Sequence, residues 1–240
     1  MSGDAQDEKA TLAAIKSRGY WEVVVRPASF EGDRVGKRLS QLEDIVRRCS
    51  VVIRGWDFPY VSDHEGFDRG QDWLGQHIQW GFHRELWRLY LSGQFVSYRG
   101  LWEDWLDESH WEDRRPESGW QPGTELRPAS ALYAYTEVFE FAAKLAVTPA
   151  GADEMVVEAT LFGLEGRHLA SEPHRMPFRT ERRATIDSFP YRQSFPRESL
   201  VAAPRDHAMD AAIDLFQHFG WDTDRQHMQG VLDELKRWPS

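Results

Sequence analysis

Segment 129–147 constrains the fold most, because apolar side chains cover most of the circumference of the helix that it predicts. Leu132, Tyr135 and Phe139 recur at the spacing of one helical face. Further apolar residues widen that surface: Val138, Phe141, Ala142, Ala143, Leu145 and Ala146. A helix of this kind has to be central, so we expect other elements to pack around it.

Two runs of β-branched residues predict buried strands on either side of a helix. The runs are Val23–Val25 and Val51–Ile53, and 37–48 between them places apolar residues at helical spacing. A helix between two strands permits a parallel crossover. Arg26 and Arg54, which end the two strands, are then expected at the same edge of a sheet.

The middle of the chain contains signals for both helix and strand. Three tryptophans recur at steps of seven residues, which suits one helical face, although two glycines among them weigh against a helix. These residues are Trp73, Gly75, Trp80, Gly81 and Trp87. Segment 94–102 predicts a strand, and the acidic segment 103–125 predicts a surface loop.

Alternating apolar and polar residues over 154–162 predict a strand with one face in solvent. A turn at 163–166 leads to a second strand at 167–171, and the two together predict a hairpin. A further strand is expected around 189–201.

Two helices close the chain, at about 206–219 and 224–237, and we expect them to pack as an antiparallel pair. We therefore predict an α+β fold with a single domain over 1–240. A mixed β-sheet of about five to seven strands is packed by helices. A short N-terminal helix lies within 1–19 and a C-terminal helical hairpin within 205–240.

Charge and composition exclude several classes of protein. The net charge of -10 argues against nonspecific nucleic-acid binding and against binding to an anionic membrane. No apolar run approaches the roughly 20 residues that span a bilayer, and Met1–Lys9 lacks the pattern of a signal peptide. Cys49 is the single cysteine, which fits a reducing compartment. We expect a cytoplasmic protein.

Motifs for common chemistries are missing from the sequence. We find no phosphate-binding loop, no dinucleotide-binding glycine pattern and no nucleophile elbow. Cys49 is expected to be a buried, inert thiol. The sequence therefore predicts no cofactor and leans against an enzyme.

Three groups of residues are candidate sites. The first group is expected beyond one sheet edge and consists of Arg26, Arg54, Trp56 and Asp57. Its two arginines would bind a carboxylate or phosphate group of a ligand, or else form structural ion pairs. The second group contains side chains that could bind a metal ion or act as acid and base, although they suit ordinary surface roles as well. These residues are His64, His77, His83 and Glu85. Arginines interleaved with aromatic residues would suit single-stranded nucleic acid, or the acidic 103–125 segment: Arg179, Arg182, Arg183 and Arg192.

The segment Arg54-Gly55-Trp56-Asp57-Phe58-Pro59 resembles one found in a family of uncharacterised bacterial proteins of similar length. Three other segments share the resemblance: Ser92–Phe95, Tyr135–Phe141 and Phe219–Trp221. The resemblance implies a bacterial, cytoplasmic protein and transfers no activity or catalytic residue.

Eleven tryptophans are the unusual feature of the composition, and six of them fall between residues 56 and 105. Indoles build cores and are also enriched at interfaces. We expect a non-enzymatic interaction or sensor-type protein that binds a protein partner, or a second copy of itself, through a Trp-rich surface. A protein that binds a small anionic ligand, or acts on one as an enzyme, is the alternative. A nucleic-acid accessory protein is a second alternative.

Overall fold

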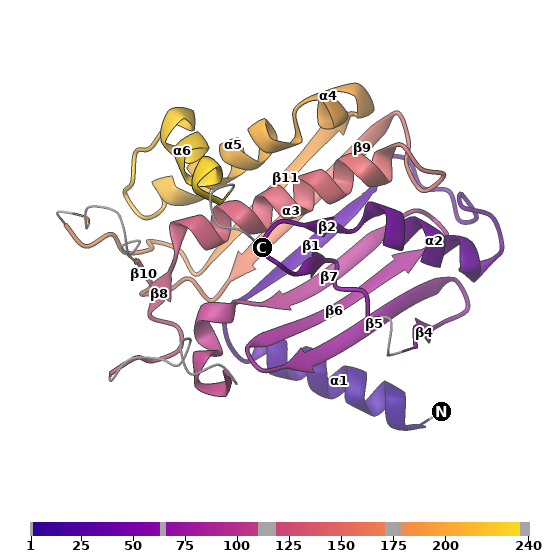
Figure 1. Cartoon of the computed structure of the whole chain (residues 1–240), viewed down its shortest axis with the longest axis horizontal. Helices are drawn as coiled ribbons and strands as arrows, with labels where there is room; N and C mark the ends of the chain where they lie inside the picture. The colour runs from indigo at the N-terminus through magenta and orange to yellow at the C-terminus, as the bar shows by residue number, and fades with distance from the viewer. Residues whose placement is uncertain (1, 63–65, 110–118, 171–177, 179, 236–240) are drawn as a thin grey trace.

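The computed structural model describes residues 2–62, 66–109, 119–170, 178 and 180–235. Within this part of the chain, one antiparallel sheet has the strand order β11-β9-β1-β7-β6-β5-β4 (Figure 1). Its strands are β1 (Tyr20–Pro27), β4 (Asp68–Arg69), β5 (Trp73–Trp80), β6 (His83–Tyr90), β7 (Phe95–Gly100), β9 (Glu154–Phe162) and β11 (Ser188–Pro196).

Helices cover the two faces of this sheet unequally. Helix α3 (Pro128–Ala146) lies across one face, and most other helices pack on the same side of the sheet (Figure 1). These are α2 (Leu39–Cys49), α4 (Arg197–Ala202), α5 (Pro204–Gln217) and α6 (Arg225–Leu235). Helix α1 (Ser2–Lys16) packs on the opposite face, over β5, β6 and β7.

Short elements connect these layers. Strands β2 (Val51–Val52) and β3 (Asp57–Phe58) form a small antiparallel sheet, and β8 (Glu125–Leu126) pairs in parallel with β10 (His168–Leu169). Two 3₁₀ turns follow β7, at η1 (Trp102–Asp104) and η2 (Leu106–Glu108).

The predicted α+β class is confirmed, and so is the central position of the 129–147 helix. Leu132, Tyr135 and Phe139 of α3 are fully buried. The predicted C-terminal helices are present as α5 and α6, which contact each other. The main sheet is wholly antiparallel, whereas we predicted a mixed one. The parallel pairing in the described residues is confined to β8 and β10.

The parallel crossover that the sequence permits between β1 and the next strand does not form. The neighbours of β1 are β7 and β9, while β2 pairs with β3 outside the main sheet. The β2 strand is only two residues long: Val51 is buried in the core near α3, whereas Val52 is 64% exposed.

The helical face that the tryptophan spacing over 73–90 suits does not form, because β5 and β6 form a hairpin that turns at Gly81. A Cβ at Gly75 would collide with the carbonyl oxygen of Trp87 on the neighbouring strand. A step of seven is odd, so in a strand it places Trp73 and Trp80 on opposite faces.

The predicted hairpin over 154–171 is wrong as well. Strand β9 pairs with β1 and β11, and β10 leaves the sheet to pair with β8. Strand β11 ends at Pro196, where α4 begins, rather than running on to residue 201.

The β11 strand forms one edge of the sheet and contains two prolines, Pro190 and Pro196. Six positions separate them, so the backbone groups of both residues point to the same side of the strand. Proline cannot donate to a ladder, so these positions suit an edge whose outward groups face solvent. The even-numbered residues of β11 therefore direct their backbone groups away from β9.

A buried ion pair between Asp104 and Arg167 joins the ends of several strands. Each residue is 1% exposed. Arg167 Nη1 donates to Asp104 Oδ1 (2.8 Å) and Nη2 donates to Oδ2. The backbone amides of Gly19 and Gly123 also donate to this carboxylate, each at 2.8 Å. Arg167 further donates to the Gly163 and Glu125 carbonyl oxygens. The start of β1, η1, the approach to β8 and the turn after β9 are thus fixed to one carboxylate.

We predict that Asp104→Asn destabilises the fold by about 3–5 kcal/mol, because Arg167 would remain buried without its counter-charge. The matched control is Asp107→Asn, which removes an exposed partner of Arg18 and should cost at most about 1 kcal/mol. Urea unfolding of both variants measures the difference. Equal losses of unfolding free energy in the two variants would contradict the prediction.

Candidate functional site

Three charged side chains meet under α3 where β7 ends. Arg54 Nε and Nη2 donate to the two carboxylate oxygens of Glu137, at 2.8 and 2.7 Å. Arg99 Nη1 donates to Glu137 Oε2 at 2.7 Å. The Glu137 side chain is 2% exposed. One buried carboxylate thus holds two arginines from separate parts of the chain.

The fold explains how each of these side chains arrives. Glu137 lies on the buried surface of α3, and Arg99 points to the same side of β7 as the core residue Phe95. Arg54 is placed by the turn after β2, where Gly55 has a φ of +81°. Burial raises the pKa of Glu137, but the charges and hydrogen bonds of Arg54 and Arg99 outweigh it, and the net shift is downward.

A second buried carboxylate, Glu85, lies on β6 opposite Arg99 in the sheet register. It is fully buried, and it accepts hydrogen bonds from Ser97 Oγ (3.3 Å) and the Tyr60 backbone amide (3.2 Å). His83 Nε2 lies 3.4 Å from Glu85 Oε2. The loop that holds Tyr60 is therefore tied to the sheet through Glu85.

Aromatic side chains beside Glu85 form what we call the aromatic cluster: Trp56, Tyr60, Trp80, Phe82 and His83. Trp56 stacks on His83 with ring centroids 5.3 Å apart and planes 5° from parallel. Trp80 packs against Trp56 at 5.1 Å and a tilt of 57°. Trp80 is 45% exposed, so this cluster reaches the surface.

The aromatic cluster continues into η1 through Phe82, which packs against Trp102 at 6.0 Å. Trp102 Nε1 donates to Ser130 Oγ, and the Arg127 guanidinium lies over the Trp102 ring at 5.1 Å. Glu103 beside them is 3% exposed, and burial raises its pKa. Its Oε2 has no hydrogen-bond partner in the described part of the chain.

The structure separates Arg26 from the other residues predicted for an anion site. Arg54 pairs with Glu137 and Trp56 stacks on His83. Asp57 pairs with Val52 in the small β2–β3 sheet, and Arg26 lies on the opposite face of β1, where it pairs with Glu158 at 3.4 Å. The prediction that Arg26 and Arg54 share a sheet edge is therefore wrong, because β2 is not a neighbour of β1.

The predicted metal or acid–base residues divide in the same way. His83 and Glu85 belong to the site, but His77 lies on the α1 side of β5 and pairs with Asp68 at 2.8 Å. His64 lies outside the described residues. Over the ranges that the structure describes, no group of three or more His, Cys, Asp or Glu side chains could hold a metal ion.

The predicted nucleic-acid arginines contact other parts of the same chain. Arg182 donates to the Gly220 carbonyl oxygen, and Arg183 pairs with Glu181 at 2.6 Å. Arg192 lies 3.7 Å from Glu158 on the solvent face of β9. Arg179 lies outside the described residues.

Two key residues of the site were not predicted as site residues. Glu137 lies within the most apolar helix of the chain, and a charged residue there was the available signal. Arg99 follows a strand pattern and carries no local signal. The predicted buried thiol is confirmed, because Cys49 is 1% exposed and burial raises its pKa to about 11.

No protein-family model matches the chain, and neither a curated protein nor a solved structure is significantly similar to it. Among the helices of the described ranges, none combines the length and apolar character needed to cross a membrane.

We predict that Glu137→Gln lowers the free energy of unfolding by about 3–5 kcal/mol, because two arginines lose their shared counter-charge in a buried setting. The control on the same helix is Glu140→Gln, whose partner Arg205 is half exposed; its loss should stay below about 1 kcal/mol. Urea unfolding tests both, and a Glu137→Gln loss no larger than the control's would contradict the prediction.

Glu103→Gln should stabilise the protein at neutral pH. The raised pKa of Glu103 means that the folded state disfavours the ionised carboxylate. The wild type therefore loses stability as pH rises above the ordinary value of 4.5, and the variant lacks this loss. Urea unfolding from pH 4 to pH 7.5 should show a gain that grows with pH. A gain that is constant over this range, or a loss, would refute the assignment.

Proposed function

We propose that this protein is a binding protein that recognises a protein partner through the aromatic cluster. The observation that carries the proposal is Trp80, which is 45% exposed and rests against Trp56 at the surface. An indole held half in solvent keeps a large apolar area for a partner to bury.

Rigidity of the aromatic cluster supports this proposal. Trp56 lies flat on His83, and His83 adjoins the buried Glu85. Trp87 Nε1 also donates to the Tyr60 carbonyl oxygen at 2.8 Å, which fixes the loop from below. A surface that is ordered before binding loses less conformational entropy when the partner arrives.

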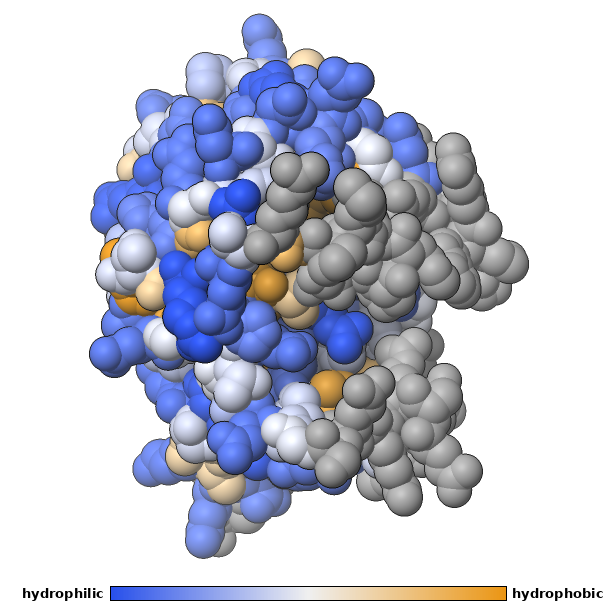
Figure 2. All heavy atoms as spheres, turned by 90° about the vertical axis from the view of Figure 1, so that its left-hand side faces the viewer, coloured by the Kyte–Doolittle hydropathy of each residue, from blue (hydrophilic) through white to orange (hydrophobic). Residues whose placement is uncertain are grey.

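The surroundings indicate what kind of partner fits. Figure 2 looks onto the left-hand side of Figure 1, toward which the β5–β6 hairpin turns, and the described residues on that face are mostly hydrophilic, with apolar side chains in small separate groups. A partner therefore needs an aliphatic or aromatic anchor flanked by polar groups. The net charge of -10 favours basic flanking residues, because it steers them during association.

A cytoplasmic location belongs to the same proposal, since Cys49 is buried and the sequence offers it no second cysteine. The aromatic cluster needs no cofactor for this role.

Selection from a random displayed peptide library tests the proposal. Peptides recovered on the wild-type protein should share an aromatic or aliphatic anchor. Trp80→Ser should weaken their binding by about 2 kcal/mol, or roughly 30-fold in Kd, as measured by fluorescence anisotropy. Trp56→Ser should have a similar effect.

The matched control is Phe30→Ser, which removes another exposed aromatic residue, 86% exposed, outside the aromatic cluster. Binding should be unchanged in this variant. Recovery of no common anchor, or equal weakening by Phe30→Ser and Trp80→Ser, would count against the proposal.

A further inference from the structure

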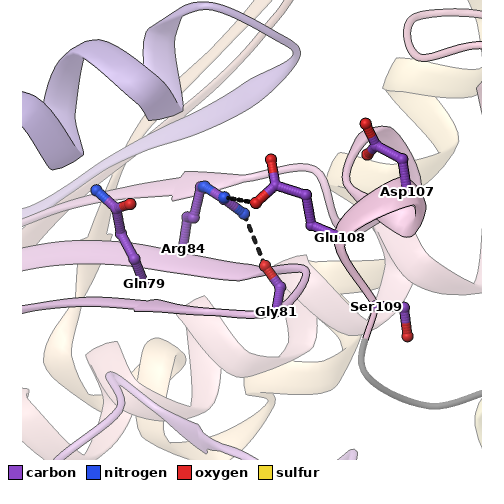
Figure 3. Close-up of a pocket in the computed structure, with 6 residues that line it drawn as sticks. All are labelled: Gln79, Gly81, Arg84, Asp107, Glu108 and Ser109. Carbon is purple, nitrogen blue, oxygen red and sulfur yellow. Dashed lines mark hydrogen bonds and ion pairs between the residues drawn. The ribbon is translucent and has the colours of Figure 1, made fainter.

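A pocket of about 510 Å³ opens on the other face of the β5–β6 hairpin, away from the aromatic cluster. Its lining comes from β5, the hairpin turn, β6 and η2 (Figure 3). The lining residues are Gln79, Gly81, Arg84, Asp107, Glu108 and Ser109. Figure 3 shows Arg84 extended toward Glu108, with Gln79 beside it on the neighbouring strand.

Arg84 is held rigidly although it lines an open pocket. Its side chain is 7% exposed, and its guanidinium lies 3.7 Å from the centroid of the Trp105 ring. Arg18 lies over the same ring at 4.0 Å. Arg84 Nη1 also donates to the Gly81 carbonyl oxygen at 2.7 Å. The guanidinium is therefore positioned before any ligand arrives.

The hydrogen-bonding edge of Arg84 is only half used. Nη2 donates to Glu108, but the adjacent Nε is buried and has no partner within the described residues. Elsewhere in the molecule the same edge is used completely: Arg54 and Arg225 each donate through Nε and Nη2 to both oxygens of one carboxylate. Arg84 Nε can accordingly donate to a second oxygen of a carboxylate or phosphate group.

The group now bound to Arg84 is easily displaced. Glu108 is 45% exposed and lies on the short η2 turn. Only the Glu108 end of this ion pair is open to solvent, so a competing anion approaches the pair from that side. The other acid of the pocket, Asp107, is occupied by Arg18 at 2.9 and 3.1 Å, and that hydrogen bond lowers the pKa of Asp107.

We propose that Arg84 anchors a binding site for the carboxylate or phosphate group of a small ligand, and that Glu108 is an internal competitor for it. The ligand's two oxygens replace Glu108 at Nη2 and engage Nε. Gln79 donates through Nε2 to Thr11 at 2.8 Å, which leaves its carbonyl oxygen to accept from a hydroxyl group of the ligand. A hydroxylated organic acid or a phosphate ester has this chemistry.

Titration calorimetry at constant ionic strength tests the site with four probes: succinate, tartrate, inorganic phosphate and glycerol 3-phosphate. Glu108→Gln should tighten saturable binding by about fivefold, because the competitor loses its charge. Arg84→Lys should weaken binding by about tenfold or more, because lysine lacks the planar edge. Glu165→Gln, an exposed acid elsewhere, is the matched control and should leave binding unchanged.

The possible outcomes distinguish a carboxylate ligand from a phosphate ligand, and some of them would refute the proposed site. Binding of the two carboxylates or of the two phosphate compounds, tightened by Glu108→Gln, identifies the class. No saturable binding by any probe, or equal or weaker binding in Glu108→Gln, overturns the site even if Arg84→Lys fails to fold. Trp80→Ser should not change this binding, so the site stands or falls separately from the partner surface.

Discussion

The carboxylate of Asp104 holds the sheet ends together, and the two surfaces described above depend on it. It accepts from Arg167 and from the amides of Gly19 and Gly123. A charged pair this deep needs all its lone pairs and donors satisfied, and here backbone groups supply most of the partners. Because Asp104 belongs to η1, the same contacts position Trp102 before it and Trp105 after it. One of these indoles adjoins the aromatic cluster and the other supports Arg84.

The β5–β6 hairpin presents different chemistry on its two faces, as strand alternation dictates. The α3 side carries His83 and Glu85 beneath Trp56 and Trp80, whereas the α1 side carries Gln79 and Arg84. In both places a cation or carboxylate is kept in position by an aromatic ring or a backbone group before any ligand arrives. We therefore regard the hairpin as the element on which partner recognition and anion binding would meet.

Sequence patterns predicted those helices and strands whose residue pattern is complete within one short segment. Helix α3 followed from its apolar surface and β9 from its alternation, since both periods are properties of a short segment. The hairpin at 73–90 was missed as a strand pair because aromatic residues recur there at a helical interval and the decisive evidence is the missing Cβ of Gly75. The ion pairs were out of reach for a different reason. Arg54 and Glu137 are 83 positions apart, and no local pattern links them. Trp56, a candidate from the sequence, lies in the aromatic cluster, but its stacking on His83 depends on tertiary structure.

The prolines of β11 bear on how this sheet can evolve and assemble. A long antiparallel sheet with an open edge invites a strand from another molecule to extend it. Pro190 and Pro196 remove two donors from that outward edge, so an incoming strand meets a ladder with gaps. Growth of the sheet by strand addition is thereby discouraged. A complex formed at the β11 edge must then be built through side chains, so its specificity depends on the shape and chemistry of those side chains rather than on backbone pairing, which any extended peptide can supply.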